Sequence, residues 1–584
     1  MRKNVTGGTI VWSKSNAGEL FPFVATPMTF SVSKKFITSL LSPFTKNFGI
    51  NIAGSLPFGL VAGRIYVNMN FAAALVRKAT FSLKSDFSEL FGGDCGELAR
   101  ALEILKHANG SGVDFSWIKF ISRLPYMAFH FAAKNFSAKR FEIDGELIET
   151  LEKYYAADFK KYPAPDLLPV IDRLSLLLEK TTEKAWPAVL GAMIANAWVF
   201  AISGSERANV LLAGSGGMAS AESGTSLLKL ALSAKNSGLS ETLASFEEFT
   251  AAARALETKD NGRAFLYNFE KFMRVHGHHA PGEVDAACPR WRETPDRIFS
   301  IVKSYLARGG IKETLDSLER LRAQNKAQAR KIISGSKLGP LKGLFRAFIS
   351  TASNGLVFRE NYKNRLVMMI DIIRKVLLEA ASRLLAAEVI TERNDIFFMD
   401  LAELQVLLDG GGGHVKDNIS RQINIRKTEY SNCEKVDPPS VVIGDFDIAA
   451  ALEKIENGLS KEKSGIRLAA GPVDTASEGS VFKGIAVSGG IVTGPARVVK
   501  SAEAAETVGH GEILVAPFTD PGWTPYFVNA AGLVTALGGP LSHGSIIARE
   551  YGIPAVVNVK NITTLISTGQ MIRVDGYKGT VTVL

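Results

Sequence analysis

The spacing of apolar and polar residues predicts a mostly α-helical region over residues 1 to about 435. Long segments there repeat apolar positions every three or four residues, which is typical of helices with one buried face. Alternating patterns typical of strands are few. The clearest helical segments are Leu147–Lys161, Leu167–Lys184, Ser245–Leu256 and Asn361–Glu388.

The pattern changes between about residues 408 and 480. Glycine, proline and serine become frequent, in GGGG at 410–413, DPPS at 437–440 and a mixed polar stretch at 458–480. Segments of this composition are flexible. We therefore assign residues 436–480 to a linker or hinge that contains one short helix, Asp445–Asn457.

Short apolar runs of strand type, separated by glycine-marked turns, begin at Val481. About a hundred residues is the usual size of one compact domain. The predicted fold class is therefore multidomain, with a large mostly helical region over 1–435 followed by a small α/β domain over 481–584. The expected strands lie in GIVTGPARVV at 490–499, EILVAPF at 512–518, GLVTAL at 532–537, PAVVNV at 554–559, MIRVDG at 571–576 and TVTVL at 580–584.

His543 lies in the first turn of the one clear helix in this C-terminal domain, Ser542–Tyr551. Unpaired N–H groups at the start of a helix bind anions. Gly538 and Gly539 allow backbone amides to approach a phosphate closely. A histidine at this place can take up a phosphoryl group and pass it on, although a satisfied surface histidine has the same local pattern.

Two further polar residues complete this candidate phosphate-binding segment. Ser542 is placed to cap the helix. Arg549 is positioned to pair with phosphate oxygens, or alternatively with Glu550 or another carboxylate. The segment thus predicts a phosphate site formed by two glycines, a serine and an arginine around His543.

The string TALGGPLSHGSIIAREYGIPAVV at 535–557 closely resembles the phosphohistidine motif of the PEP-utilising enzymes, among them PEP synthase, pyruvate phosphate dikinase and rifampicin phosphotransferase. SGGIVTGPARVV at 488–499, TDPGWTP at 519–525 and VDG at 574–576 are similar to the same domain. The resemblance covers about residues 480–584. It implies that His543 is the phosphorylated catalytic residue and that its domain swivels between two sites.

The helical region resembles the acceptor-binding part of rifampicin phosphotransferase more weakly. The similar segments are WSKSNAGELFPFVATPMTFS at 12–31, GHHAPGEVDAACPRW at 277–291, RENYK at 359–363 and NDIFFMDLAEL at 394–404. This resemblance implies acceptor binding at Arg359, Glu360 and Lys363. Spacing alone places Arg359 and Lys363 on one helix face, where they repel each other unless an anion lies between them. By itself that spacing favours a solvated helix face.

The segment at 277–291 supplies the remaining candidate residues. We interpret His278 and Glu283 as polar groups of the acceptor site, one of which could act as general base. The family usually has arginine and glycine where His279 and Ala280 stand. Although His276, His278 and His279 are close in sequence, no cysteine lies at zinc-site spacing, so no metal site is expected.

Two modules of the PEP-utilising enzymes have no counterpart in these residues: an ATP-grasp domain and the barrel that binds PEP or pyruvate. The layout resembles the histidine-bearing subunit of phenylphosphate synthase. That resemblance implies a separate ATP-grasp subunit as partner, Mg²⁺ bound with its nucleotide, and a phenol-like hydroxyl acceptor. The alternatives are a rifampicin-type small-molecule phosphotransferase, a phosphocarrier, and a non-catalytic scaffold.

Composition and charge indicate which partners and which cellular compartment to expect. The net charge of +10 suits phosphates or an acidic partner, but the basic residues are dispersed among acids and form no nucleic-acid-binding pattern. Three distant cysteines indicate a reducing compartment. The uncharged stretch Ala185–Ser205 is nearly long enough to cross a bilayer, yet its proline and small residues favour a buried core helix. We therefore expect a cytoplasmic protein without a membrane or nucleic-acid partner.

Overall fold

The protein is described here from a computed structural model. It describes residues 10–14, 17–47, 50–51, 57–71, 114–115, scattered positions between 122 and 134, 141–213, 217–336, 338–411, 413–456, 467–468, 477–500, 508–509, 511–540 and 542–584. The chain forms two compact units. The first comprises Met1–Pro187, Val284–Ala287 and Met369–Pro472, and the second comprises Ala188–Glu283, Cys288–Met368 and Val473–Leu584.

The first unit combines helices with a small antiparallel sheet of order β3-β4-β1-β7. These strands are β1 (Val11–Ser13), β3 (Phe58–Val61), β4 (Arg64–Asn68) and β7 (Val441–Ile443). The sequence did not predict this sheet, because strands of three to five residues are too short for their alternation to stand out. The other elements, some shared with the second unit, are α1 (Ala17–Leu20), α2 (Pro27–Asn47), β2 (Ile50–Asn51), β5 (Asp114–Phe115), α7 (Gly145–Ala156), α8 (Leu167–Leu212), α15 (Lys342–Ala386), α16 (Leu401–Leu408), α17 (Gly413–Glu434), β6 (Val436–Asp437), α18 (Ile448–Glu456) and β8 (Arg467–Leu468).

The expected linker over 436–480 is partly ordered within this unit. Val442, in β7, pairs with Trp12 of β1, so part of the linker forms an edge strand of the sheet. Helix α18 agrees with the helix predicted at Asp445–Asn457. Residues 457–466 and 469–476, where the hinge was expected, lie outside the described residues.

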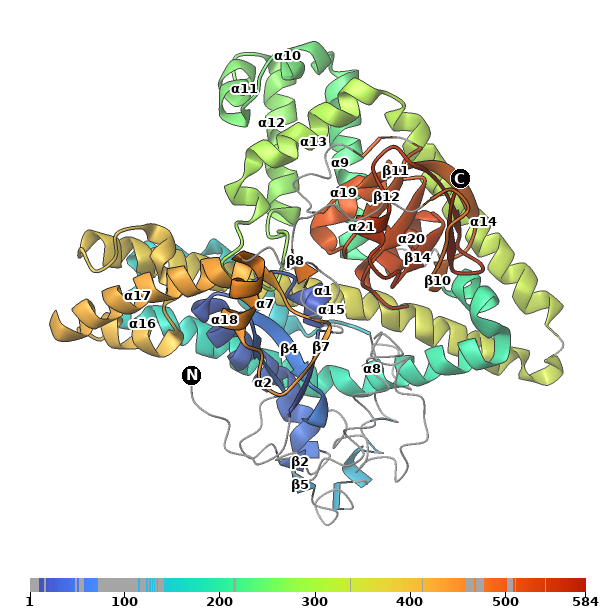
Figure 1. Ribbon diagram of the computed structural model, residues 1–584. Helices are drawn as coiled ribbons and strands as arrows, with labels where there is room; N and C mark the ends of the chain where they lie inside the picture. The colour runs from blue at the N-terminus through green and yellow to red at the C-terminus, as the bar shows by residue number, and fades with distance from the viewer. Residues whose placement is uncertain are drawn as a thin grey trace. The chain divides into compact units, whose positions relative to one another are not determined.

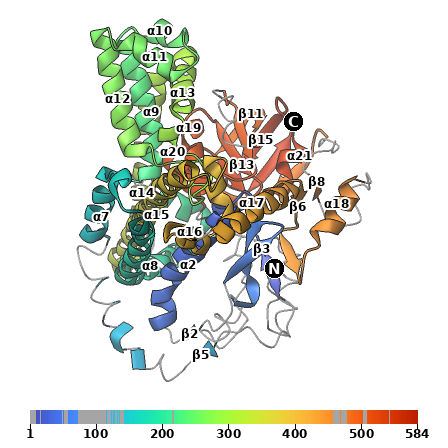
Figure 2. The ribbon, with the colours of Figure 1, turned by 90° about the vertical axis from the view of Figure 1, so that its left-hand side faces the viewer.

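The second unit begins with a helical bundle in which α9, α11, α12 and α13 run side by side (Figure 1, Figure 2). Its apolar faces meet in one core that includes Leu227, Phe265 and Phe299. The helices are α9 (Ala219–Asn236), α10 (Ser240–Ala244), α11 (Phe249–Leu256), α12 (Asp260–His276), α13 (Pro295–Arg308) and α14 (Ile311–Gly335), together with parts of α8 and α15. The mostly helical character predicted for this region is confirmed.

The C-terminal part of the second unit is an α/β domain built on an eight-stranded sheet of order β10-β14-β13-β12-β11-β15-β16-β9. Strands β11 to β14 pair in parallel, and the others pair antiparallel. The six predicted strands are all present. The elements are β9 (Val481–Lys483), β10 (Ile485–Ser488), β11 (Ile491–Val498), β12 (Ile513–Ala516), α19 (Thr524–Phe527), β13 (Gly532–Thr535), α20 (His543–Tyr551), β14 (Ala555–Val557), α21 (Ile562–Leu565), β15 (Met571–Asp575) and β16 (Thr580–Val583).

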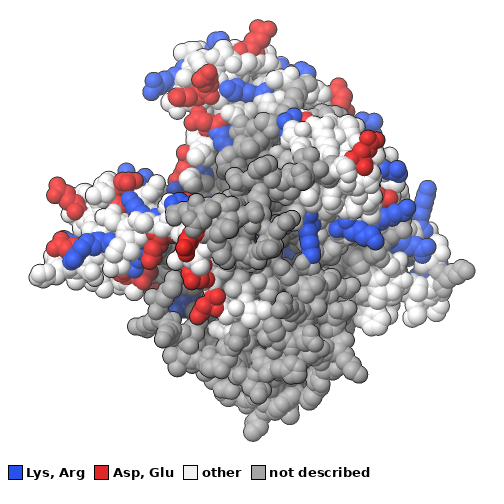
Figure 3. Space-filling model, viewed as in Figure 1, with Lys and Arg blue, Asp and Glu red and all other residues white. Residues whose placement is uncertain are grey.

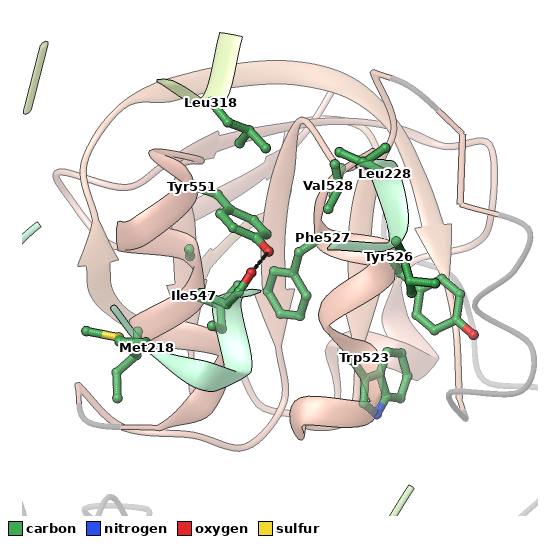
Figure 4. Packing of buried hydrophobic residues seen from close by; sticks show 14 of the residues in the cluster. Met218, Leu228, Leu318, Trp523, Tyr526, Phe527, Val528, Ile547 and Tyr551 are labelled. Carbon is green, nitrogen blue, oxygen red and sulfur yellow. Dashed lines mark hydrogen bonds between the residues drawn. The ribbon is translucent and has the colours of Figure 1, made fainter. Parts of the chain in front are cut away.

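A continuous apolar core joins the α/β domain to the bundle within the second unit. Figure 4 shows Met218, Leu228 and Leu318 of the helical part against Phe527, Ile547 and other side chains of the α/β domain. The Tyr551 hydroxyl donates a hydrogen bond of 2.8 Å to the carbonyl of Ala221. The domain that carries His543 is therefore held against the bundle mainly by buried apolar surface.

Charged side chains are mixed over much of the face shown in Figure 3, but mostly basic ones gather over α14. One helical stretch, Ala164–Gly204, is long and apolar enough to cross a membrane, and 39% of its most apolar window is buried. By length and composition alone, a single such helix is weak evidence for a membrane span. The cytoplasmic location inferred from the sequence stays a prediction.

Candidate active site

His543 is placed by a strand–loop–helix unit of the α/β domain. Strand β13 ends at Thr535, and α20 begins at His543 after the glycine pair. Gly538 has a φ of 140°, in the region that favours glycine, so a side chain there would strain the loop. The loop therefore sets His543 at the helix start, as predicted, with its side chain buried.

The other residues of the predicted phosphate segment have partners within the protein. Ser542 occupies the cap position of α20, but its hydroxyl bonds the Ser545 hydroxyl at 2.9 Å instead of a backbone N–H. Arg549 is fully buried and donates through Nε to the carbonyl of Val487 at 2.8 Å. Its guanidinium also donates to the carbonyl of Pro540. In this structure Arg549 therefore fixes the loop before His543, and its phosphate-binding role stays a prediction.

Gly544 leaves space for a close packing contact directly after His543. A Cβ atom at this position would clash with the Thr519 hydroxyl and lie 3.2 Å from Leu533. We expect Gly544→Ala to destabilise the domain by about 1–3 kcal/mol, the usual range for overpacking. Denaturant unfolding of the full chain measures this. Gly539→Ala is the matched control, because a Cβ there meets no atom within 4 Å, and an equal loss in both variants would contradict the packing argument.

The two imidazole nitrogens of His543 face different groups. Nε2 lies 3.1 Å from the hydroxyl of Thr524. Nδ1 lies 4.0 Å from Oε2 of Glu360, on α15. Phe527 packs edge-on against the ring, with centroids 6.3 Å apart. The ring is thus fixed between a hydroxyl of its own domain and a carboxylate of the helical part.

Glu360 is a buried carboxylate held in its charged form. Oε1 accepts a hydrogen bond of 2.9 Å from Arg359. Burial is the largest single influence and would raise its pKa, but the interactions with His543, Arg359 and Lys363 together outweigh burial, and the pKa of Glu360 lies well below its ordinary value. The charges of Arg359 and Lys363 act in the same direction. The structure thus brings the three acceptor residues predicted from RENYK together with His543.

The loop after α12 adds His278 and Glu283 to the same site. His278 is buried, and its Nε2 lies 2.8 Å from the amide oxygen of Asn364 on α15. Burial, and then His279, lower the pKa of His278 well below the ordinary histidine value. Oε1 of Glu283 lies 2.6 Å from Nδ1 of His279. Burial raises the pKa of Glu283 to about 7.

Asp520 is a further buried carboxylate, and it connects the α/β domain to the same loop. Oδ2 accepts a hydrogen bond of 2.8 Å from the backbone of Gly282, and Oδ1 accepts one of 2.8 Å from Gly522. Burial, and then Glu283, raise the pKa of Asp520 to about 6. Two carboxyl groups with raised pKa values and one with a lowered value therefore share this site, a combination typical of proton-transfer centres.

The polar groups of the site do not form a metal centre. Within the part of the chain that the structure describes, no group of three or more His, Cys, Asp or Glu side chains is arranged to hold a metal ion. The cationic groups of the site, Arg359 and Lys363, instead suit an anion such as a phosphoryl group.

Comparison with known proteins agrees with this geometry. Residues 184–360 match the fourth domain of rifampicin phosphotransferase, and residues 508–579 match the mobile domain of PEP-utilising enzymes. The second match contains His543 and the first contains Glu360. Two regions of the chain are thus similar to domains of the PEP-utilising enzymes. The region similar to the mobile domain follows the region similar to the rifampicin phosphotransferase domain in the chain.

Individual relatives show the same similarity over part of their length. Rifampicin phosphotransferase of Bacillus subtilis (strain 168) is 34% identical over 313 residues, which are 53% of this chain and 33% of the relative. The prodigiosin synthesizing transferase PigC of Serratia marcescens is 31% identical over 334 residues, 56% of this chain and 34% of the relative. The chain thus matches about a third of the length of these relatives.

Four residues of the site, Thr524, Asp520, His279 and Asn364, were given no role from the sequence. Thr524 and Asp520 stand in TDPGWTP, a string that resembles a motif of the mobile domain but assigns no role to either residue. That motif marked the segment, but only the folded structure shows that Thr524 reaches His543. Asn364 directly follows RENYK and carried no signal of its own.

Proposed function

We propose that this chain is a phosphotransferase that carries a phosphoryl group on His543. The group comes from ATP bound on a separate ATP-grasp subunit and passes to a hydroxyl acceptor of phenol type, as in phenylphosphate synthase. One observation carries the proposal: Nδ1 of His543 lies 4.0 Å from Glu360, beside the cations of the predicted acceptor site. A carrier histidine inside an acceptor site is the arrangement that the second transfer requires.

In the first transfer, the imidazole attacks a phosphoryl group of ATP on the partner subunit. AMP leaves as the imidazole bonds to the β-phosphorus, and water then cleaves the bond between the β- and γ-phosphoryl groups. Inorganic phosphate is released, and the β-phosphoryl group remains on His543. Mg²⁺ neutralises the triphosphate and belongs with the nucleotide on the partner. This chain contributes the nucleophile and the fold that presents it.

We expect the phosphoryl group on Nε2 of His543. Nδ1 faces the carboxylate of Glu360, which favours a proton on that nitrogen and leaves the lone pair on Nε2. Thr524 lies beside Nε2 and can orient it. Two-dimensional ¹⁵N–³¹P NMR of the phosphorylated chain identifies the nitrogen, and phosphorus coupled to Nδ1 would contradict this assignment.

In the second transfer, the acceptor oxygen attacks phosphorus as the N–P bond breaks, and the bonding electron pair returns to the imidazole. Arg359 and Lys363 neutralise the charge on the phosphoryl oxygens. Glu283 or His278 takes the hydroxyl proton. Burial of Glu283 and His278 keeps water away from the proton acceptor, so hydrolysis does not compete with transfer to the hydroxyl.

Labelled ATP tests the proposal. The chain is incubated with ATP carrying ³²P at the β or the γ position, with and without an ATP-grasp partner, and then chased with phenol. We expect the chain to retain acid-labile label from β-labelled ATP but not from γ-labelled ATP, and only when the partner is present. This label should then pass to phenol. Absence of label under every condition would support the scaffold alternative instead.

A rifampicin-type phosphotransferase is the second candidate. It is favoured by the match of residues 184–360 to a domain of rifampicin phosphotransferase. A chase with rifampicin in place of phenol separates the two candidates. A simple phosphocarrier would need no enclosed acceptor site, whereas Glu360, Glu283 and His278 are all buried around His543.

A further inference from the structure

His279 and Glu283 form a buried pair. The transfer steps above assign no role to His279. The exposed fractions of their side chains are 1% and 3%, and the two polar atoms lie 2.6 Å apart. Burial, and then the charges of His543, Arg290 and Lys363, lower the pKa of His279 to about 3. His279 is therefore neutral near pH 7, and the contact is a hydrogen bond between a neutral imidazole and a carboxyl group.

Glu283 is surrounded by several charged or titratable groups from different elements. Lys363, His543 and Arg290 favour its ionised form, and Glu360 opposes it. Asp520 of the α/β domain interacts with it as well. Burial nevertheless dominates and raises the pKa of Glu283 to about 7. A permanent cation in place of His279 would reverse this balance, because it would stabilise the carboxylate directly.

Glu283 suits proton acceptance better than its neighbours do. Glu360 has a pKa well below its ordinary value, so its carboxylate is a weak base. The low pKa of His278 likewise makes it a weak base near neutral pH. A carboxyl group with a pKa of about 7 is matched to general-base catalysis near neutrality.

We propose that His279 is a positioning residue whose hydrogen bond orients Glu283 as the proton acceptor of this site without placing a charge beside that carboxylate. This inference rests on the proposed transfer to a hydroxyl acceptor. As the acceptor oxygen bonds to phosphorus and the N–P bond of phospho-His543 breaks, the hydroxyl proton moves to Glu283. The Nδ1–H group of His279 holds Oε1 of Glu283 and leaves Oε2 available for that proton.

Three substitutions of His279 separate charge from hydrogen bonding. His279→Arg adds a permanent cation, and we expect the ionisation midpoint of Glu283 to fall by about 1–3 pH units. His279→Leu removes the hydrogen bond that favours the carboxylate, so the midpoint rises. His279→Asn places an amide N–H near the position of Nδ1 and leaves the midpoint close to that of the wild type.

Infrared difference spectroscopy of the unphosphorylated full chain measures the midpoint. The carbonyl band of the protonated Glu283 carboxyl is identified by its loss in Glu283→Gln. Opposite shifts in the arginine and leucine variants support the inference, and misfolding does not produce opposite shifts. Equal midpoints in all three variants, or the lack of a titrating band removed by Glu283→Gln, would overturn it.

Transfer to phenol from the prephosphorylated chain supplies the second readout. We expect the acid limb of the pH–rate profile to follow the infrared midpoint in each variant, since Glu283 must be ionised to accept the proton. If the acid limb of the pH–rate profile stayed at the same pH while the infrared midpoint of Glu283 moved, the role of Glu283 as proton acceptor would be overturned. Absence of transfer in every variant would contradict the proposed function, whereas the infrared midpoints would still decide how His279 acts on Glu283.

Discussion

His543→Asn is expected to abolish phosphoryl labelling of this chain. Asparagine is similar in size to histidine but has no nitrogen that can attack phosphorus. His543 is the one histidine that the structure places at the start of α20, beside Thr524 and Glu360. Acid-labile ³²P retained on the chain after incubation with β-labelled ATP and an ATP-grasp partner gives the measurement.

His414→Asn is the matched control, because His414 is an exposed residue of α17. This variant should take up label as the wild type does. Label on the His543→Asn chain at the wild-type level would show that another residue carries the phosphoryl group. A near-ultraviolet circular dichroism spectrum unchanged from the wild type would show that the fold of the variant is intact.

Glu360→Gln is expected to separate the two transfers. Glu360 belongs to the helical part of the site, so phosphorylation of His543 at a separate donor site should proceed normally. Transfer from phospho-His543 to phenol should slow by roughly 10²–10⁴-fold, the range for losing a group that orients or moves a proton. A pulse of β-labelled ATP followed by a phenol chase measures the two rates separately.

Glu313→Gln provides the comparison for this variant, since Glu313 is an exposed residue of α14. In this variant, the rate of phosphorylation of His543 and the rate of transfer to phenol should both match those of the wild type. If the Glu360→Gln variant transferred its phosphoryl group to phenol as fast as the wild type, the contact between Glu360 and His543 would have no part in the transfer.

The sequence predicted the α/β domain well because its signals are local. Strands β12 and β14 are uninterrupted apolar runs, and glycine residues mark turns near the strands. The small sheet of the first unit escaped prediction for the opposite reason. Its strands come from residues 11–13, 58–68 and 441–443, and only their pairing across the folded chain makes them a sheet.

The sequence predicted which residues belong to the candidate site better than it predicted how their side chains are arranged. The motifs identified His543 and the residues of RENYK, because each motif is a contiguous string. The direction of a side chain depends on distant partners that a string does not contain. Arg549 illustrates this, since its guanidinium is taken up by the carbonyls of Val487 and Pro540. Glu283 also acquires its raised pKa only through burial in the folded chain.

The apolar core between the mobile domain and the helical bundle makes their association sensitive to temperature. Tyr526, Phe527 and Val528 lie in this core with Leu228 and Leu318 (Figure 4). In the proposed first transfer the domain leaves the bundle for its donor, so this surface would meet water and the heat capacity of the protein would rise. Attraction between apolar surfaces weakens on cooling. If the domain moves as proposed, cold is therefore expected to lengthen the time that His543 spends away from Glu360, and warming to shorten it.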